Sequence, residues 1–245
     1  MAIELTNLVC VITGAGEGVG HGLVHGFLKR GARVIAGLHH LERSAAVVSP
    51  AHPVQLDVTN KNEVRAAVDQ IIRQYGRIDV WINNAGVYPR HSAATMTFED
   101  WHHVLDTNLS GAWRCCETII PALKRQGGGT IINVGTIGLR LGMANLTHYL
   151  ASKGGVVGMT RGLARDLGPY GIRVNCVHLG AVRTEGELRL FPDQQQILTS
   201  LEEKQALRGR MTPETVEPVF AFLSSSDSSD ITGQCLTVDR GWSHD

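Results

Sequence analysis

Short apolar runs rich in β-branched residues alternate with longer amphipathic stretches along almost the whole chain. This alternation restricts the fold more than any other feature, because strands that are apolar along their length must be covered on both faces. We therefore expect a parallel sheet between two layers of helices, in one α/β domain spanning residues 1–245. The seven expected strands are Val9–Thr13, Val34–Ala36, Val54–Val58, Ile78–Ile82, Thr130–Val134, Arg173–Val177 and Leu236–Val238.

Four longer stretches between these runs are expected to be helices. They are Val19–Arg30, Asn60–Tyr75, Phe98–Arg125 and Thr147–Leu167. Asn60 is suited to cap the second helix, and Pro121 is expected to bend or interrupt the third. This order of strands and helices predicts a doubly wound, Rossmann-like fold, in which ligands bind beyond the carboxyl ends of the strands.

One stretch departs from the alternation. Residues 185–210 are polar and rich in charge and come between the last two expected strands. A long insertion inside a compact domain is usually functional or mobile. We favour a lid over a substrate pocket, and a plain helical excursion on the surface is the alternative.

Composition excludes several classes of partner. Lysines plus arginines and aspartates plus glutamates both number 23, so the net charge gives no support for binding nucleic acid or an anionic membrane. No apolar run approaches the roughly 20 residues of a membrane span, and no signal peptide is indicated at the N-terminus. The five cysteines form no CxxC pair, which suits reduced, buried thiols. We expect a cytoplasmic protein.

A glycine-rich turn follows the first expected strand and opens the first helix. It reads TGAGEGVG over Thr13–Gly20. Glycines allow a sharp turn and a close approach of the backbone to a pyrophosphate, and a helix N-terminus offers unpaired N–H groups to the phosphates. A merely structural turn is the alternative.

Polar residues follow two further strands at the same edge of the expected sheet. Asp57 and Val58 follow the third strand, and Asn83, Asn84, Ala85 and Gly86 follow the fourth. Because ligands bind at the carboxyl ends of the strands, Asp57 is expected to accept from an adenine amine and the Asn83–Gly86 turn to flank the adenosine. Structural capping is the alternative for each.

Tyr149 and Lys153 lie four residues apart on an expected helix and therefore share one face. A nearby ammonium favours the phenolate form of a tyrosine, so the pair is suited to proton transfer near neutral pH. The spacing alone is common, and its meaning depends on the other motifs.

Taken together, these motifs resemble the short-chain dehydrogenase/reductase family, in its classical form, over nearly the whole chain. The resemblance rests on the glycine turn, on NNAG at Asn83–Gly86, on Asn108, on Gly135–Thr136 and on YLASK at Tyr149–Lys153. It implies hydride transfer between a nicotinamide cofactor and a secondary alcohol or ketone. The family's last strand often packs against a neighbouring subunit, so the resemblance also implies a homotetramer.

The resemblance assigns roles residue by residue. Catalysis falls to Asn108, Thr136, Tyr149 and Lys153, with Tyr149 as general acid/base and Asn108 at a helix distortion that anchors a water. Substrate contacts fall to Thr136, Ile137, Met143 and Tyr149. Cofactor contacts fall to Gly14, Glu17, Gly18, Val19, Gly20, Leu38, Asp57, Val58, Asn84, Ala85, Gly86, Tyr149, Lys153, Gly180, Val182 and Thr184.

Two departures from the family's pattern bear on activity. Thr136 stands where the family usually has serine, which keeps the hydroxyl but adds a methyl group that narrows the pocket. Leu179 stands where the family usually has proline, so the backbone loses a fixed φ before the nicotinamide loop.

The choice between NAD and NADP rests on the charges near the adenosine ribose. The acidic residue that usually marks NAD use is absent at Gly37, so backbone groups near Leu38 would serve the ribose diol. Glu17 would repel a 2′-phosphate by a few kcal/mol at an effective dielectric constant of about 20. The only groups that could offset this repulsion are His39, His40 and Arg43. We favour NAD, and NADP stays open.

Other functions were weighed against the NAD-dependent alcohol dehydrogenase. An NADPH-dependent carbonyl reductase is the alternative enzyme, and a catalytically silent cofactor-binding protein is the alternative outside enzymes. The eleven histidines include close pairs but lack the spacing of a known metal motif, so no metal site is expected.

Overall fold

The computed structural model describes residues 3–42, 47 and 49–244. Its seven strands form one parallel sheet in the order β3-β2-β1-β4-β5-β6-β7, which confirms the predicted doubly wound fold. The strands are β1 (Val9–Thr13), β2 (Arg33–Leu38), β3 (His52–Gln55), β4 (Val80–Asn83), β5 (Gly129–Thr136), β6 (Ile172–Leu179) and β7 (Cys235–Val238).

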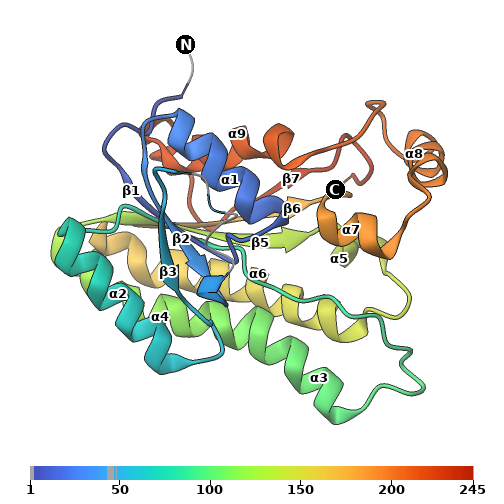
Figure 1. Ribbon diagram of the computed structural model, residues 1–245, viewed down its shortest axis with the longest axis horizontal. Coiled ribbons are helices and arrows are strands. Elements are labelled where there is room, and N and C mark those ends of the chain that lie inside the picture. The colour runs from blue at the N-terminus through green and yellow to red at the C-terminus, as the bar shows by residue number, and fades with distance from the viewer. Residues whose placement is uncertain (1–2, 43–46, 48, 245) are drawn as a thin grey trace.

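Helices cover both faces of the sheet (Figure 1). One face carries α1 (Gly18–Lys29) and α9 (Pro213–Ser224), and the other carries α2 (Lys61–Tyr75), α4 (Gly111–Gln126) and α6 (Thr147–Leu167). The remaining elements are α3 (Phe98–Leu105), η2 (Asp106–Ser110), α5 (Gly138–Leu141), η3 (Gly168–Tyr170), α7 (Glu185–Leu190), α8 (Gln194–Glu202) and η4 (Ser226–Ser228).

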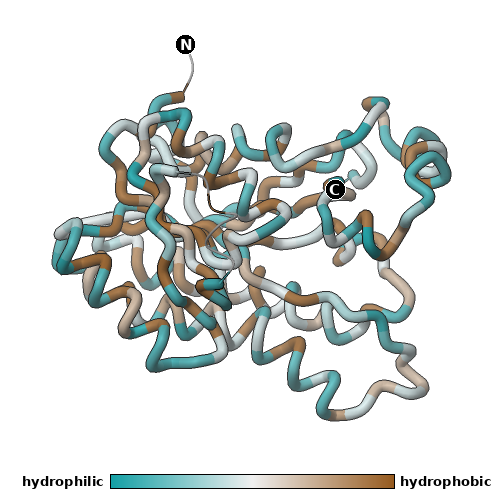
Figure 2. The backbone as a smooth tube through the Cα atoms, in the orientation of Figure 1, coloured by the Kyte–Doolittle hydropathy of each residue, from teal (hydrophilic) through white to brown (hydrophobic). Residues whose placement is uncertain are grey.

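Two hydrophobic cores lie on opposite sides of the sheet. Figure 2 shows apolar segments concentrated along the strands and on the inner sides of the helices. Trp81 of β4 is fully buried on the α2–α4–α6 side, and Phe27 and Phe220 are fully buried on the α1–α9 side. This double burial is what the near-continuous apolar strands predicted.

The long helix predicted over 98–125 is interrupted, but the predicted position was wrong. A π-helical segment, η2, separates α3 from α4, whereas α4 runs through Pro121 without a break. Proline removes the hydrogen bond to the carbonyl of Glu117. Both residues are exposed, so water can satisfy that carbonyl.

Three further differences separate the prediction from the structure. Strand β3 covers His52–Gln55 rather than Val54–Val58, and Pro53 is tolerated because β3 is an edge strand. Helix α9 was not predicted, since Pro213 and Pro218 disguise its pattern. The insertion at 185–210 contains the helices α7 and α8.

The predicted cap at Asn60 is confirmed, because its side chain accepts from two backbone N–H groups of α2.

Candidate active site

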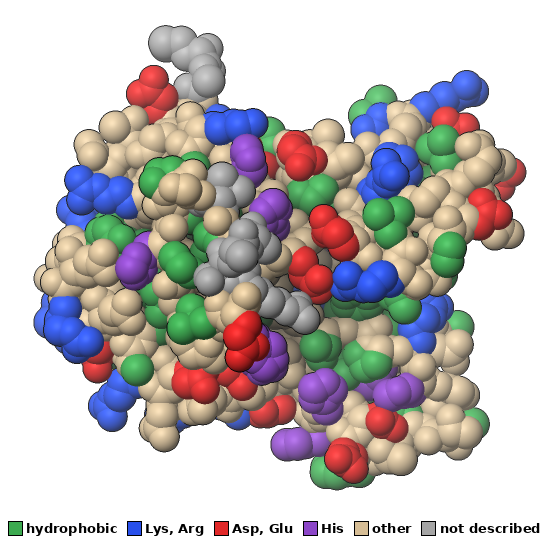
Figure 3. All heavy atoms as spheres, viewed as in Figure 1, with side chains coloured by type: hydrophobic (Ala, Val, Ile, Leu, Met, Phe, Trp, Pro, Cys, Tyr) green, Lys and Arg blue, Asp and Glu red, His purple; other side chains and the backbone are tan. Residues whose placement is uncertain are grey.

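A cavity of about 780 Å³ opens at the carboxyl ends of β1 to β4. This is the edge where the strand order reverses, between β1 and β4, and where doubly wound folds bind their ligands. Figure 3 shows acidic and histidine side chains gathered around the middle of this side of the molecule. The described residues that line the cavity include eleven of those predicted to bind cofactor: Gly14, Glu17, Gly18, Val19, Leu38, Asp57, Val58, Asn84, Ala85, Gly86 and Thr184.

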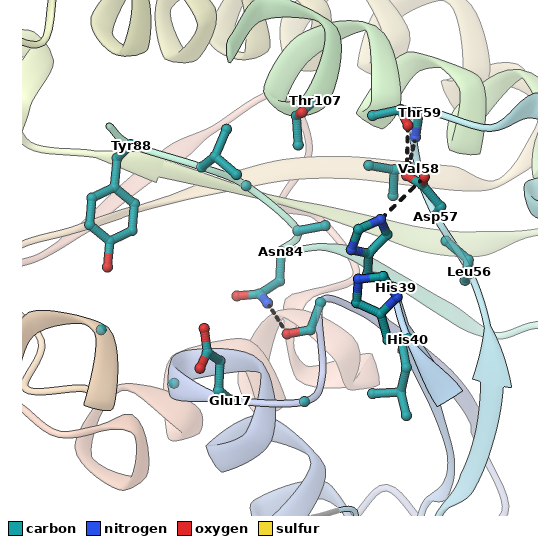
Figure 4. A pocket seen from close by; sticks show the side chains of 18 of the residues that line it. Glu17, His39, His40, Leu56, Asp57, Val58, Thr59, Asn84, Tyr88 and Thr107 are labelled. Carbon is teal, nitrogen blue, oxygen red and sulfur yellow. Dashed lines mark hydrogen bonds and ion pairs between the residues drawn. The ribbon is translucent and has the colours of Figure 1, made fainter. Parts of the chain in front are cut away.

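The glycine turn has the close backbone approach that the sequence predicted. Gly14 and Gly18 have φ values of 63° and 58°, which favour glycine. A Cβ on Gly14 would lie 2.8 Å from the Cα of Ala85. The side chain of Asn84 donates to the carbonyls of Thr13 (2.9 Å) and Gly14 (3.1 Å), so it holds the turn in place (Figure 4).

Gly20, Gly180 and Val182 lie outside the lining of the cavity, and each has a packing role. A Cβ on Gly20 would lie 2.3 Å from the carbonyl oxygen of Gly14, so this glycine lets α1 approach the turn. A Cβ on Gly180 would lie 2.9 Å from the Cβ of Asp239. Val182 pairs with Met211 through an isolated bridge.

The end of the cavity away from Tyr88 is formed by Asp57 and two histidines (Figure 4). Asp57 Oδ1 accepts from the backbone N–H and the hydroxyl of Thr59, each at 2.8 Å. His39 Nε2 lies 3.4 Å from Asp57 Oδ2. Partial burial acts to raise the pKa of Asp57, but the hydrogen bonds from Thr59 and the nearby His39 outweigh it and lower that pKa. Arg43, the other predicted compensating cation, lies outside the described residues.

The sequence analysis missed one wall of the cavity. It is a polar stripe on α3 and η2, made of Glu99, His102, His103, Asp106 and Thr107. These positions recur at helical spacing, three or four residues apart, so the pattern was present in the sequence. The spacing alone does not show that these side chains point toward the cavity, because that depends on how α3 packs in the folded chain.

Helix α7 lies against the glycine turn. Glu185 Oε2 accepts from the backbone N–H of Gly18, the first residue of α1, at 3.1 Å. Arg189 pairs with Glu17 at 3.1 Å between Nη2 and Oε2. The Glu185 carboxylate therefore occupies the kind of anion position that a helix N-terminus offers to a phosphate. Only His39, His40 and Arg43 were expected to offset the Glu17 charge, and the structure adds Arg189 from the facing helix.

Thr136, Tyr149 and Lys153 meet where β5 ends and α6 begins. Burial raises the pKa of Tyr149 to about 12, against a hydrogen bond from Thr136 that acts to lower it. Burial lowers the pKa of Lys153 to about 8. Lys153 Nζ lies 5.9 Å from the centre of the Tyr149 ring and donates to the carbonyl of Val134 at 2.7 Å. The expected lowering of the tyrosine pKa is therefore absent here, because loss of solvation dominates both groups.

Asn108 lies within the π-helical segment η2, where the resemblance placed a helix distortion. Its Oδ1 accepts from the N–H of Val87 at 2.8 Å, and its Nδ2 donates to the carbonyl of Val87 at 2.9 Å. Nδ2 also lies 3.1 Å from Ser152 Oγ, one residue before Lys153. Asn108 thus ties the loop after β4 to the helix that carries Tyr149 and Lys153.

The predicted substrate contacts lie in the segment between β5 and α6. Ile137 is buried and its N–H donates to the carbonyl of Leu179, whereas Met143 is partly exposed. Tyr88, which lines the cavity, packs edge-on against Tyr149 with ring centres 6.2 Å apart. Tyr88 therefore links the cavity to the ring of Tyr149, which is not itself among the residues that line it.

Comparison with known proteins decides the family. A family model described as Enoyl-(Acyl carrier protein) reductase matches residues 14–243. The D-xylose 1-dehydrogenase of Caulobacter vibrioides is 38% identical over 239 residues, which are 95% of this chain and 94% of the relative. The chain belongs to the short-chain dehydrogenase/reductase family. This short-chain dehydrogenase/reductase is also 35% identical to the 3-oxoacyl-[acyl-carrier-protein] reductase FabG of Thermotoga maritima, covering 98% of this chain and 99% of that one.

Solved structures agree with the family. A putative gluconate dehydrogenase from Agrobacterium tumefaciens superposes with a TM-score of 0.93 at 27% identity, covering 99% of this chain and 98% of that chain. The aldohexose dehydrogenase of Thermoplasma acidophilum gives 0.89 at 29% identity, covering 99% and 96%. Members of this family are oxidoreductases that use NAD(P). Among the described residues, no helix has the length and apolar character that crossing a membrane requires.

Proposed function

We propose that this short-chain dehydrogenase/reductase transfers a hydride between NAD(H) and the CH–OH or C=O group of a small secondary alcohol or ketone. The main support for this proposal is that Thr136, Tyr149 and Lys153 lie together beside the cavity, whose glycine turn suits a dinucleotide. NAD(H), when bound, accepts or supplies the hydride. Tyr149 Oη takes the alcohol proton or returns it to the carbonyl oxygen, and the Thr136 hydroxyl holds that oxygen in place.

The other residues of the site position this chemistry. Lys153 holds the nicotinamide ribose and exchanges protons with Tyr149, and Asn108 supports a water on that path. Gly14, Gly18 and Val19 would hold the pyrophosphate, and the anionic Glu185 carboxylate on the Gly18 N–H supports this assignment. The remaining cofactor contacts are proposed at Glu17, Gly20, Leu38, Asp57, Val58, Asn84, Ala85, Gly86, Gly180, Val182 and Thr184.

The preference for NAD over NADP is supported by the charges around the cavity. Its lining within the described residues holds four carboxylates, Glu17, Asp57, Glu99 and Asp106, and no lysine or arginine. Arg189 and Arg114 pair with Glu17 and Asp106 from outside the lining, so repulsion of a 2′-phosphate depends on Asp57 and Glu99. Histidines are mostly neutral at pH 7 and attract a 2′-phosphate weakly. Fluorescence titration at fixed salt should give tighter binding of NADH than of NADPH. Tighter NADPH binding would favour the alternative, an NADPH-dependent carbonyl reductase.

A sugar hydroxyl is the first substrate class to test. The support comes from the relatives named D-xylose 1-dehydrogenase and aldohexose dehydrogenase, whereas the FabG relative supports a 3-oxoacyl thioester. Aldoses with NAD and 3-oxoacyl thioesters with NADPH should be compared by kcat/KM. Turnover of an aldose and none of the thioester would support the sugar class.

Tyr149→Phe tests the mechanism directly. Removal of the hydroxyl should lower kcat by roughly 10²–10⁴-fold, the usual contribution of general acid–base catalysis, and leave NADH binding nearly unchanged. Tyr170→Phe is the matched control, because Tyr170 is exposed on η3. An unchanged kcat in Tyr149→Phe would remove this tyrosine from the mechanism. Binding of NADH without turnover in the wild type would instead favour the silent cofactor-binding protein.

The insertion at 185–210 is proposed to be a lid, since α7 contacts the glycine turn through Glu185 and Arg189.

A cytoplasmic location is proposed because all five cysteines are free thiols and four of them are buried, which suits a reducing compartment.

A further inference from the structure

Two thiols and an imidazole meet on the sheet away from the cofactor cavity. Cys176 and His178 lie two residues apart on β6 and share one face, and Cys235 of β7 is the register partner of Cys176. One ligand atom from each of the three residues lies within 4.8 Å of the other two. None of the three lines the cavity at the carboxyl ends of β1 to β4.

The imidazole is buried, and its polar neighbour is the Cys235 thiol. His178 is 6% exposed, and within the described part of the chain its ring nitrogens have no nitrogen or oxygen partner, whereas the Cys235 side chain interacts with the ring. The hydroxyl of Thr237, the register partner of His178, is likewise buried and unpaired there. Buried polar groups without partners are costly, so a native structure that keeps them requires an explanation such as a bound ion.

The imidazole and the Cys176 thiol pack directly against the backbone of the neighbouring strand. Gly135 of β5 is the register partner of His178. A Cβ on Gly135 would lie 2.4 Å from His178 Cδ2 and 2.8 Å from Cys176 Sγ. Any side chain at Gly135 would therefore displace the imidazole and the thiol from their present positions.

We propose that Cys176, His178 and Cys235 form a binding site for a zinc(II) ion, with water in the fourth position. Zinc favours sulfur and imidazole ligands in a tetrahedron, at about 2.3 Å from sulfur and 2.0 Å from nitrogen. Such ligand atoms lie about 3.8 Å apart, so side-chain rotations bring the present cluster to that spacing. Two thiolates neutralise the ion, which matters because Lys153 and Arg161 act on Cys176 as nearby positive charges.

The half-buried position of Cys235 gives the ion a route of entry. No metal site was expected from the sequence, and this proposal departs from that expectation. Cys235 is far from Cys176 along the chain, and only the parallel pairing of β6 with β7 brings the two thiols together.

Cobalt(II) titration of the reduced, full-length protein tests the site. We expect one equivalent to produce the thiolate-to-cobalt charge-transfer band and the strong visible bands of tetrahedral cobalt, and one equivalent of zinc to abolish them. Competition with a chromophoric chelator then gives the zinc affinity. The Cys235→Ser and His178→Gln variants should each bind zinc at least tenfold more weakly.

Cys115→Ala is the matched control, since Cys115 is a buried free thiol outside the cluster and should leave zinc affinity unchanged. Circular dichroism of each variant verifies that it is folded. Absence of the charge-transfer band in the reduced wild type, or equal affinity in wild type and cluster variants, would overturn the proposal.

Discussion

At the scale of single residues, Lys153 shows how the candidate site departs from what stability alone would select. It is 5% exposed, and burial lowers its pKa to about 8. Burial acts on Tyr149 in the opposite sense and raises its pKa to about 12. At neutral pH Tyr149 therefore keeps its proton, which suits donation to a carbonyl, and Lys153 is held charged against the cost of desolvation.

Lys153→Met should stabilise the protein while abolishing turnover. The pKa of the lysine is lower in the folded chain than its ordinary 10.5, so between pH 8 and 10.5 the unfolded chain binds more protons and wild-type stability rises with pH. Below pH 8 the lysine is charged in both the folded and the unfolded chain, so folding bears the whole cost of burying the ammonium group. Removing the charge should raise the free energy of unfolding by about 2 kcal/mol at pH 7, after loss of the hydrogen bond to Val134.

Urea denaturation at pH 7 and pH 10 measures this effect. The gain in Lys153→Met should shrink at the higher pH. Lys61→Met, at an exposed lysine paired with Glu117, is the control and should change stability by less than about 0.5 kcal/mol. A variant less stable than the wild type at pH 7 would show that desolvation does not dominate at this position.

At the scale of elements, the contact between α1 and α9 explains a helix that the sequence pattern hid. Two glycines of α1 face α9. A Cβ on Gly22 would lie 2.1 Å from the Cβ of Pro213, and a Cβ on Gly26 would lie 2.4 Å from Glu217. Glu217 is buried and pairs with Arg30 at 2.8 Å. Propensity alone argues against α9, so the helix depends on a partner whose surface is formed by glycines.

Gly22→Ala should destabilise the protein although alanine favours helices. The added methyl group forces α9 away from α1, and overpacking of this kind costs about 2 kcal/mol. Gly168→Ala is the control, since a Cβ there meets no described atom within 4 Å. Thermal unfolding of both variants should show a lower Tm for Gly22→Ala alone. Equal Tm values would mean that α9 adjusts without cost.

The contact of α7 with the glycine turn leads to a prediction about cofactor affinity. Glu185 accepts from the Gly18 N–H where a phosphate is proposed to bind. An exposed charge at a helix terminus contributes about 0.3–1 kcal/mol, so Glu185→Gln should tighten NADH binding by about two- to fivefold. Fluorescence titration measures this, and Glu202→Gln on α8 is the control. Weaker binding in Glu185→Gln would assign the carboxylate a role in holding the cofactor.

At the scale of the whole molecule, the fold and half of the site follow from one property of the sequence. Strand periodicity places each strand, and parallel strands bring their carboxyl ends to one edge, so residues after β1, β3 and β4 could be predicted to meet. The contacts that these residues make with other elements could not be predicted. The Glu17–Arg189 pair, the α3 stripe and the Cys176–Cys235 pairing each depend on packing between elements far apart in sequence.

The proposed homotetramer is supported by exposed features on the outer side of the α4–α6 layer. Trp113 of α4 is 46% exposed, and on α6 a Cβ at Gly158 or Gly162 would meet no described atom within 4 Å. An exposed tryptophan and a helix face without packed neighbours are the kind of surface that a second copy can cover. Within one chain, alanine at Gly158 should therefore be harmless, whereas in an assembly a larger side chain should block the approach of the partner helix.

Trp113→Glu and Gly158→Leu should each reduce the assembly from four copies of the 26.5 kDa chain to a smaller species, as measured by light scattering after size exclusion. A charged side chain on α4 and a larger side chain on α6 would each oppose burial of the α4–α6 layer between subunits. Phe98→Glu is the control, because Phe98 is 81% exposed at the start of α3 and belongs to neither α4 nor α6. If both variants stay tetrameric, the subunits meet elsewhere, and β7 becomes the surface to test. If the wild type is monomeric, the exposed Trp113 has no role in assembly.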